Sequence, residues 1–414
     1  MVVPGTKFLE ATILKTMRRF EKLLFVGLLF SMIIILTGCS KAGGYYRDGK
    51  KYFANGNYEE AVKNFAAAID ENPNRAEYYI DYGMALIGLT RYDEAIEQFE
   101  NIIMDKKIAI VLENNKRALR GKGIAYLNIL DYREAIKQFD QALKIRVLSE
   151  LDMDILYYKG RALISSGAYK EAAETYTDII NQFGEKANIL ADRAYTYQRT
   201  GEYDKGLDDY DKAIALEANN YEYFFGKFYL LRQMGRDDEA NEVLSKAAQI
   251  EVKTKADKFM LAKIHFYQGL YDQAFPELSE SFANGFIDAY FYIGEIYTNK
   301  KDYSTAKYYY EKYIEEGGTN NPQVYNQVAS CLIKMEEYEQ AIPYLETGMR
   351  YANNGMMRVL LKNEIIVYEK LGDFENALAK LQSYISAYPE DEDARREKTF
   401  LTSRLPNESN DVNN

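Results

Sequence analysis

The sequence predicts an all-α protein, an α-α superhelix assembled from about ten helix–turn–helix repeats. Three observations predict this fold class: a unit that recurs about every 34 residues, apolar residues at helical spacing within each unit, and only 7 prolines in 414 residues. Apolar residues at i, i+3, i+4 and i+7 are typical of amphipathic helices. A unit of this length buries its apolar face by stacking on its neighbours, so several copies form one continuous structure.

The second helix of each unit carries a small residue that marks the repeat. In GNYEEAVKNFAAAIDENP (56–73) and TRYDEAIEQFENII (90–103), this residue follows a tyrosine and two or three polar positions. An aromatic residue comes four positions later in both segments. The small residue recurs along the chain at Ala61, Ala95, Ala135, Ala172, Gly206, Ala240, Ala274, Ala306, Ala341 and Ala377.

The first helix of most units carries a second small residue, twelve positions before the first one. Small residues let two helix backbones approach, and large aromatic side chains fill the spaces between these contacts. We therefore expect most of the 38 tyrosines to be packing residues. This second position is occupied by Gly49, Gly83, Gly123, Gly160, Ala194, Ala262, Gly294 and Ala329.

A glycine follows the first helix in many units. Glycine adopts the left-handed conformation that ends a helix without steric cost. The sequence therefore predicts a sharp turn between the two helices at Gly56, Gly167, Gly201, Gly235, Gly269 and Gly372.

These features resemble the tetratricopeptide repeat family, a helix–turn–helix repeat of 34 residues. The resemblance covers roughly residues 42–389 and implies a right-handed solenoid whose first helices line a concave surface. The widest insertion is KIAIVLENN (107–115), between the second and third units. Residues 283–318 look Sel1-like, a related helical repeat.

The N-terminal region has the features of a secretion signal. Its apolar run, Leu23–Leu36, is 14 residues long, whereas a membrane-spanning helix needs roughly 20. Arg18, Arg19 and Lys22 give the positive charge that precedes the apolar core of a signal peptide. The sequence leaves open whether translation starts at Met1 or Met17.

The run Leu36-Thr37-Gly38-Cys39 resembles the lipobox of bacterial lipoproteins. The resemblance implies cleavage before Cys39 and a diacylglyceryl group on its thiol. Two acyl chains give stable membrane anchoring. We expect a lipid-anchored protein of the bacterial cell envelope, on the outer face of the cell membrane or on the periplasmic side of a membrane. The sequence does not distinguish an envelope with one membrane from an envelope with two.

These features predict five segments. Residues 1–38 are the signal peptide, and 39–44 form the lipidated N-terminus with a short tether before a first helix at Tyr45. The repeat array covers 45–389. A charged helix at 390–405 caps the array, as solenoids require, and the polar tail 406–414 is expected to be disordered.

Composition and missing motifs argue against several classes of protein. The net charge of −11 lacks the basic footprint of nucleic-acid binders. His265 is the single histidine, so with two cysteines the chain lacks the ligands for a structural zinc site. No phosphate loop, nucleophile elbow, zinc-protease or EF-hand motif occurs. We expect no catalytic residues, no metal and no cofactor, and we expect His265 and Cys331 to be buried.

A line of side chains on the first helices is the predicted partner-binding groove. Residues three before, one after and four after the small residue of the first helix share one helix face. Arginine and tyrosine are enriched at binding hot spots, and arginine can hold a carboxylate with two hydrogen bonds. The predicted groove residues are Arg120, Tyr157, Arg161, Tyr195, Arg199, Phe225, Tyr229, Arg232, Phe259, Lys263 and Tyr267.

The sequence thus favours a scaffold for cell-envelope assembly that binds a protein or peptide segment with acidic groups or a free C-terminus. In a competing interpretation, the arginines only pair with neighbouring carboxylates. Other hypotheses are a binder of cell-wall glycan or a small solute, and an accessory subunit of an envelope enzyme. The sequence does not identify the partner or the oligomeric state.

Overall fold

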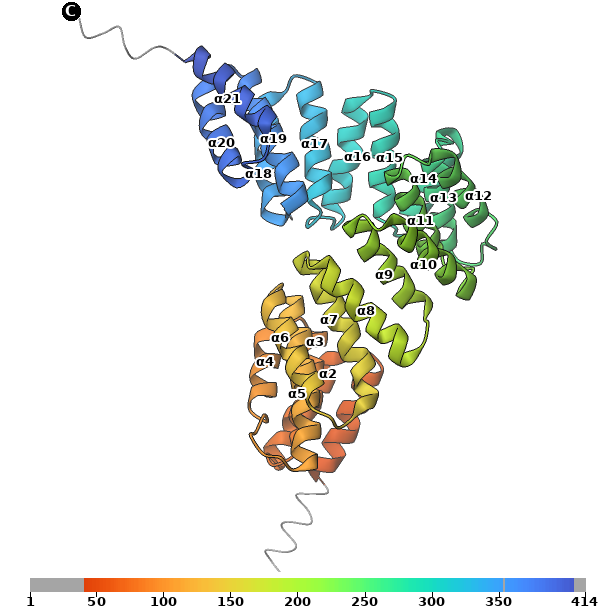
Figure 1. The fold of residues 1–414 in the computed structure, drawn as a ribbon, viewed down its shortest axis with the longest axis vertical. Helices are drawn as coiled ribbons and strands as arrows, with labels where there is room; N and C mark the ends of the chain where they lie inside the picture. Colours follow the sequence, from red (N-terminus) through yellow and green to blue (C-terminus); the bar gives the residue numbers. More distant parts are fainter. Residues whose placement is uncertain (1–40, 353, 406–414) are drawn as a thin grey trace, which may run out of the picture. The chain divides into compact units, whose positions relative to one another are not determined.

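The computed structural model describes residues 41–352 and 354–405, and this part of the chain is helical throughout (Figure 1). Its regular elements are α-helices and one short 3₁₀-helix, Ser149–Leu151. The prediction of an all-α fold is confirmed. Cys39, the signal peptide and the C-terminal tail lie outside the described residues.

The helices pair in sequence order, and each helix packs mainly on its neighbours along the chain. A helix over residues 41–54 precedes α2, and α21 follows the last pair. This order gives the expected ten pairs. The other bounds are α2 (Tyr58–Glu71), α3 (Ala76–Gly88), α4 (Tyr92–Glu100), α5 (Ala109–Asn128), α6 (Tyr132–Lys144), α7 (Asp152–Ser166), α8 (Tyr169–Phe183), α9 (Ala187–Thr200), α10 (Tyr203–Leu216), α11 (Tyr221–Gln233), α12 (Asp237–Ala247), α13 (Lys255–Tyr267), α14 (Tyr271–Ala283), α15 (Asp288–Asn299), α16 (Tyr303–Glu315), α17 (Pro322–Lys334), α18 (Tyr338–Tyr351), α19 (Asn354–Lys370), α20 (Phe374–Ala387) and α21 (Glu392–Arg404).

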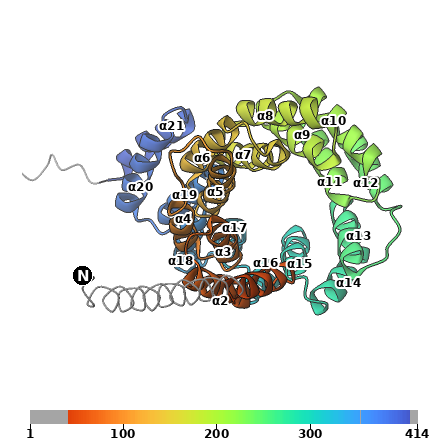
Figure 2. The same cartoon turned by 90° about the horizontal axis from the view of Figure 1, so that it is seen from below.

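The chain divides into two compact units, Met1–Leu230 and Leu231–Asn414, and the division falls within α11. In the N-terminal unit, α7, α8, α9 and α10 lie side by side in chain order (Figure 2). In the C-terminal unit, α15 to α20 follow one another in the same way (Figure 1). Each unit has its own series of small hydrophobic cores, one at each junction between helices.

In five repeats, the small residue of the first helix is in contact with an aromatic ring from the second helix. A Cβ atom added at Gly123 would lie 2.4 Å from Cε1 of Phe139, closer than real Cβ atoms approach. In the five repeats with glycine at this position, the aromatic residue follows the glycine by sixteen positions, and its side chain is fully buried. After Ala262 and Ala329 a leucine occupies the same position. The contact between ring and glycine confirms the predicted packing role of both residues. The same contact is made by Gly49 with Phe65, Gly83 with Phe99, Gly160 with Tyr176 and Gly294 with Tyr310.

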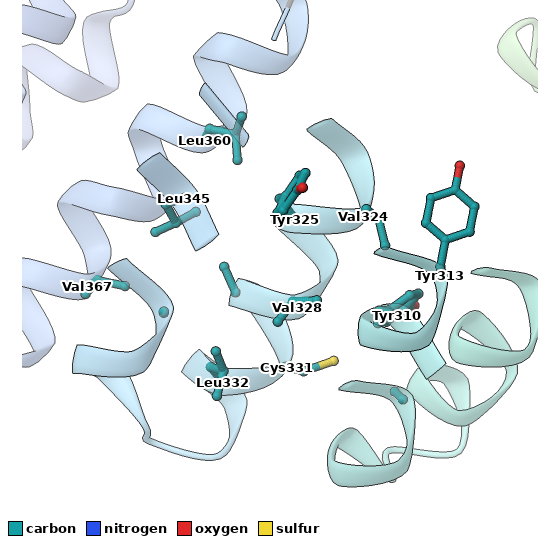
Figure 3. Packing of buried hydrophobic residues seen from close by; sticks show 13 residues of the cluster. Tyr310, Tyr313, Val324, Tyr325, Val328, Cys331, Leu332, Leu345, Leu360 and Val367 are labelled. Carbon is teal, nitrogen blue, oxygen red and sulfur yellow. The ribbon is translucent and has the colours of Figure 1, made fainter. Parts of the chain in front are cut away.

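The largest core of the C-terminal unit lies between α16, α17, α18 and α19 (Figure 3). Tyr310 is fully buried there, close to Cys331, which is a free, buried thiol. Burial raises the pKa of the Cys331 thiol to about 11, so this thiol stays protonated at neutral pH. His265 is also buried, with Nδ1 2.6 Å from Oε2 of Glu277. Both residues are therefore packing residues, as the sequence predicts.

The turn between the helices of a pair uses a left-handed residue whether or not glycine is present. All six glycines predicted for this turn have positive φ. Four repeats that lack this glycine place another residue in the same conformation, at Thr90, Leu130, Lys301 and Glu336. Sequence patterns overlooked these four turns because their residues do not favour positive φ.

The insertion at residues 107–115 becomes an N-terminal extension of α5, which is 20 residues long. Asn115 fixes this extension through two hydrogen bonds with the backbone of Met104, of 2.7 and 3.1 Å. The adjacent Lys116 is fully buried, and its ammonium group donates to the carbonyl oxygens of Ile145 and Val147. Lys116 also pairs with Asp152 at 2.6 Å, so its buried charge is compensated.

The first described helix includes residues 41–44, which the sequence analysis assigned to a tether. Ala42 is fully buried against Ala68 and Tyr78, and this contact explains why the helix begins before Tyr45. The helical array therefore begins at least four residues closer to Cys39 than the sequence indicated.

At the other end, α21 lies in the segment predicted to cap the array and packs on α20. The side chains of Ala394 and Leu401 are buried in the hydrophobic core formed with α19 and α20. Asp391 caps the N-terminus of α21 by accepting a hydrogen bond from Ala394, and it also accepts from Arg358, Lys362 and Tyr384. The bonds from Lys362 and Arg358 hold the pKa of Asp391 far below its usual range.

The left-handed turn at Leu130 gives a first prediction, for Leu130→Gly. Leu130 is 67% exposed, so removing its side chain takes little apolar surface out of the core. Glycine also removes the steric cost of the left-handed conformation, φ = 67°. We expect the local unfolding free energy to rise by up to ~1 kcal/mol. Hydrogen exchange in α5 and α6 measures this change.

The matched control is Ile129→Gly at the adjacent position, where φ is −84°. Glycine gives no conformational relief there and should lower protection. Equal effects of both substitutions would contradict the account of the turn.

A second prediction concerns Glu369 of α19. Burial and the neighbouring Glu397 carboxylate of α21 raise the pKa of Glu369 from 4.5 to about 7. Between these pH values the folded chain binds more protons than the unfolded chain, so stability falls as pH rises. We expect α21 to be less protected from hydrogen exchange at pH 8 than at pH 5, after correction for intrinsic exchange.

Glu369→Gln should abolish most of this pH dependence and increase protection at pH 8. Glu375→Gln, which alters an exposed carboxylate on α20, serves as the control and should behave like the wild type. Unchanged pH dependence in the Glu369 variant would rule out this carboxyl as its source.

Candidate functional site

The predicted groove residues divide between the two units. Seven of them, from Arg120 to Tyr229, belong to the N-terminal unit, and Arg232, Phe259, Lys263 and Tyr267 belong to the C-terminal unit. Each group is therefore a separate candidate surface.

Two of the predicted arginines pair with carboxylates of their own unit. Arg120 forms an ion pair with Asp154 and lies over the ring of Tyr158, with 5.7 Å from Cζ to the ring centroid. Arg232 lies 3.3 Å from Asp237. For these two residues the competing interpretation, neutralisation by neighbours, describes the structure.

Two of the predicted aromatic residues are packing residues. Phe225 and Phe259 are almost completely buried, and Phe259 stacks on Phe286 at 5.2 Å between ring centroids. Their burial leaves them little surface for a partner, whereas Arg120 and Tyr157 at the equivalent positions of other repeats stay partly exposed. Lys263 lies 5.8 Å from the ring centroids of both Phe259 and Tyr292, so it too contributes to packing.

Tyr157 and Tyr195 are brought together at a hollow in the N-terminal unit. The hollow has a volume of about 290 Å³ and is formed by α7, α9, α10 and the start of α11. Tyr195 stays 39% exposed there. The residues that line the hollow are Tyr157, Asn188, Ala191, Asp192, Tyr195, Tyr210, Glu222 and Tyr223.

Repeat packing positions these side chains. Tyr210 is the ring that follows Ala194 by sixteen residues, and it also packs on Gly226, where an added Cβ would lie 2.4 Å from its Cε1. The hydroxyl of Tyr223 donates to Oε2 of Glu217 at 3.0 Å. These contacts within the fold therefore hold Tyr210 and Tyr223 in place in the wall of the hollow.

Asp192 is the half-buried carboxylate of the hollow. Within the part of the chain that the structure describes, it makes no hydrogen bond or ion pair. Burial raises the pKa of Asp192 to about 6, and the positive charge of Arg161 opposes this shift. The neighbouring Asp209 differs, because Arg193 holds both of its oxygens at 2.7 Å. The negative charge of Asp192 is thus not balanced by a hydrogen bond or ion pair from another described residue.

Arg161 and Arg199 are the predicted arginines that remain exposed. Neither forms an ion pair with any described residue. Arg199 lies over the ring of Tyr169 at 5.0 Å, and Tyr169 meets Tyr195 edge to face at 6.4 Å. Tyr229 on α11 is 42% exposed. These residues leave an exposed polar and aromatic surface on the first helices α7, α9 and α11.

The sequence analysis missed Asp192, Tyr210 and Tyr223 as site residues. The sequence pattern correctly indicated that Tyr210 is a packing residue but did not indicate that it also lines the hollow. Asp192 lies two positions before Ala194, beside the stripe that was considered. An acidic residue inside the first helix, next to a binding stripe, was the signal that could have revealed it.

Among the described residues, no helix is both long and apolar enough to span a bilayer. The same residues hold no cluster of three or more histidine, cysteine, aspartate or glutamate side chains suited to a metal ion.

Tetratricopeptide repeat family profiles match six segments that together cover more than half of the chain: residues 46–106, 120–186, 187–220, 288–316, 322–354 and 366–391. The chain belongs to the tetratricopeptide repeat family. The segment 288–316 lies within the stretch expected to resemble a Sel1-like repeat, and it matches a tetratricopeptide profile.

Curated relatives are distant. The chain is 24% identical over 197 residues to the Hsp70-Hsp90 organizing protein of Triticum aestivum, covering 41% of this chain and 34% of that protein. It is 24% identical over 367 residues to the human Superkiller complex protein 3, covering 85% of this chain and 21% of that protein. The chain therefore spans about a third or less of the length of these two relatives.

Solved structures of tetratricopeptide proteins are similar at low identity. Yeast Tom70 aligns with a TM-score of 0.49 and 15% identity, over 88% of this chain and 89% of that chain. A tetratricopeptide repeat protein from Parabacteroides merdae aligns with a TM-score of 0.45 and 15% identity, over 60% of this chain and 94% of that one.

Proposed function

We propose that the chain is a non-enzymatic scaffold of the bacterial cell envelope that is lipid-anchored through Cys39 and holds a protein or peptide partner on the first helices of its N-terminal unit. The observation that carries the proposal is the exposed surface on α7, α9 and α11. Arg161, Arg199 and Tyr195 remain accessible there. Other residues of the predicted groove are less available, since Arg120 and Arg232 are ion-paired and Phe225 and Phe259 are buried.

The chemistry of this surface suits a polypeptide. Tyrosine and arginine provide apolar area with directional hydrogen bonds, the combination that is enriched in binding hot spots. Arg161 and Arg199 are placed to receive acidic groups or a free C-terminus of the partner. Relatives support a binding role, since one of them is named for organizing two other proteins.

The anchor rests on the sequence around Cys39. The basic residues, the short apolar run and the small residue before the cysteine occur in the order of a lipoprotein signal. The helical array begins at residue 41 or earlier, so the proposed anchor would leave almost no linker between lipid and fold. The N-terminal unit, which carries the proposed partner surface, would consequently be the unit joined directly to the anchor.

Phase separation of the purified full chain in a cloud-point detergent tests the anchor. The wild-type chain, expressed in a bacterium that processes lipoproteins, should enter the detergent-rich phase, because two acyl chains bind membranes stably. Cys39→Ala should move the chain to the aqueous phase. Cys331→Ala, which alters the buried thiol, should leave the partition unchanged. A Cys39→Ala chain that still enters the detergent phase would exclude lipidation at this residue.

Photo-crosslinking in living cells tests the binding surface. A photoreactive amino acid in place of Tyr195 should give a discrete crosslinked protein that mass spectrometry identifies. The matched control places the same amino acid at Asp208, an exposed position on the second helix α10, and should give no such product. Crosslinks to glycan alone, or identical products at both positions, would contradict a protein-binding surface on the first helices.

A further inference from the structure

The hollow beside Tyr195 has a chemistry of its own, distinct from the two exposed arginines. Four tyrosines supply most of its wall, and its charged lining residues are the carboxylates of Asp192 and Glu222. Its volume of about 290 Å³ is close to the lower end of the range for small-molecule pockets and is sufficient for one long side chain.

We propose that this hollow binds the cationic side chain of an arginine or lysine in a partner polypeptide. The inference rests on the proposed scaffold function and specifies the chemistry of the partner. Aromatic rings attract cations through the negative faces of their π-systems, and a nearby carboxylate adds a charge-assisted hydrogen bond. Tyr157, Tyr195 and Asp192 bring both elements together.

Charge complementarity indicates that the ligand carries a positive charge. Asp192 is partly removed from water without the hydrogen bonds that usually compensate a buried carboxylate. Asp209 shows the alternative within the same repeat, since Arg193 satisfies both of its oxygens. A guanidinium or ammonium group in the hollow would give Asp192 the partner that the chain itself does not provide.

The groups around Asp192 come from every element that forms the hollow. Tyr157 and Arg161 belong to α7, Tyr210 to α10, and Glu222 and Tyr223 to α11. Burial, and to a smaller extent the charge of Asp192, raises the pKa of Tyr157, Tyr210 and Tyr223. Among the residues that the structure describes, Arg161 is the cation whose charge lowers the pKa of Asp192, and it lies on the exposed surface.

Binding of capped nonapeptides to the full chain, measured by calorimetry at pH 7.5, tests the inference. The peptides are built from glycine, serine and alanine and carry one central arginine, lysine, citrulline or glutamate. We expect the arginine or lysine peptide to bind about tenfold more tightly than the neutral citrulline peptide. Equal affinity for arginine, lysine and citrulline peptides, or a preference for glutamate, would overturn the inference.

Variants locate the interaction. Asp192→Asn should abolish the preference for cationic peptides, and Asp208→Asn, with the same charge change on α10, should preserve it. Arg161→Gln should strengthen binding of the arginine peptide, because it removes a repulsive charge, whereas a site for acidic groups would be weakened. Retention of the cationic preference in Asp192→Asn would exclude the hollow as the site. Circular dichroism establishes that each variant remains folded.

The pH dependence gives a second readout. Affinity for the arginine peptide should fall as pH drops from 7.5 to 5, because Asp192 becomes protonated, and Asp192→Asn should not show this fall. Failure of all these tests, together with crosslinking of a protein at Tyr195, would disprove the cationic site and leave the scaffold function standing. Failure of the crosslinking as well would remove both.

Discussion

Five repeats depend on one contact, an aromatic ring held against a glycine of their own first helix. The ring of Phe139 on Gly123 is an example, and an added Cβ would have no room. Burying a ring removes 150–250 Å² of surface from water, so the contact supplies a large share of the stability of a repeat. Because the two residues are sixteen positions apart in each of these repeats, this contact also fixes how the two helices of a pair are aligned.

The same ring can reach the next repeat. Phe99 packs on Gly83 of its own pair and on Gly121 of the following helix, where an added Cβ would lie 2.3 Å from its ring. Tyr210 likewise packs on Gly226 of the following helix α11, and it also lines the hollow. The candidate site thus uses a side chain that the fold already holds rigidly, which limits the entropy lost when a partner binds.

The repetitive part of the sequence predicted the repetitive part of the structure. Spacing, small residues and glycine turns recur in each unit, so the all-α fold, the helix pairs and the buried state of His265 and Cys331 could be read directly. The left-handed turn at Leu130 could not, because stacking of the helices imposes that conformation against the preference of leucine. The early start of the first helix depends on Ala42 meeting Tyr78, a contact between repeats.

The candidate site was harder to predict, because it depends on individual side chains rather than on the repeat. A long arginine side chain can reach a carboxylate of the next repeat, and Arg120 of α5 pairs with Asp154 of α7 across 34 residues of sequence. Phe225 and Phe259 belong to the core, although Arg120 and Tyr157 occupy the equivalent positions of other repeats and stay partly exposed. That Asp192 has no hydrogen bond or ion pair among the described residues depends on the positions of its neighbours in space, which the repeat pattern does not give.

A double-mutant cycle at Gly123 and Phe139 tests the ring contact most directly. Hydrogen exchange in α5 and α6 would report the stability of the wild type, Gly123→Ala, Phe139→Leu and the double variant. The account predicts that the added methyl group of Gly123→Ala destabilises the chain when Phe139 is present and costs much less with leucine, a coupling of about 1 kcal/mol or more. Additive effects of the two substitutions would show that the ring and the small residue do not depend on each other.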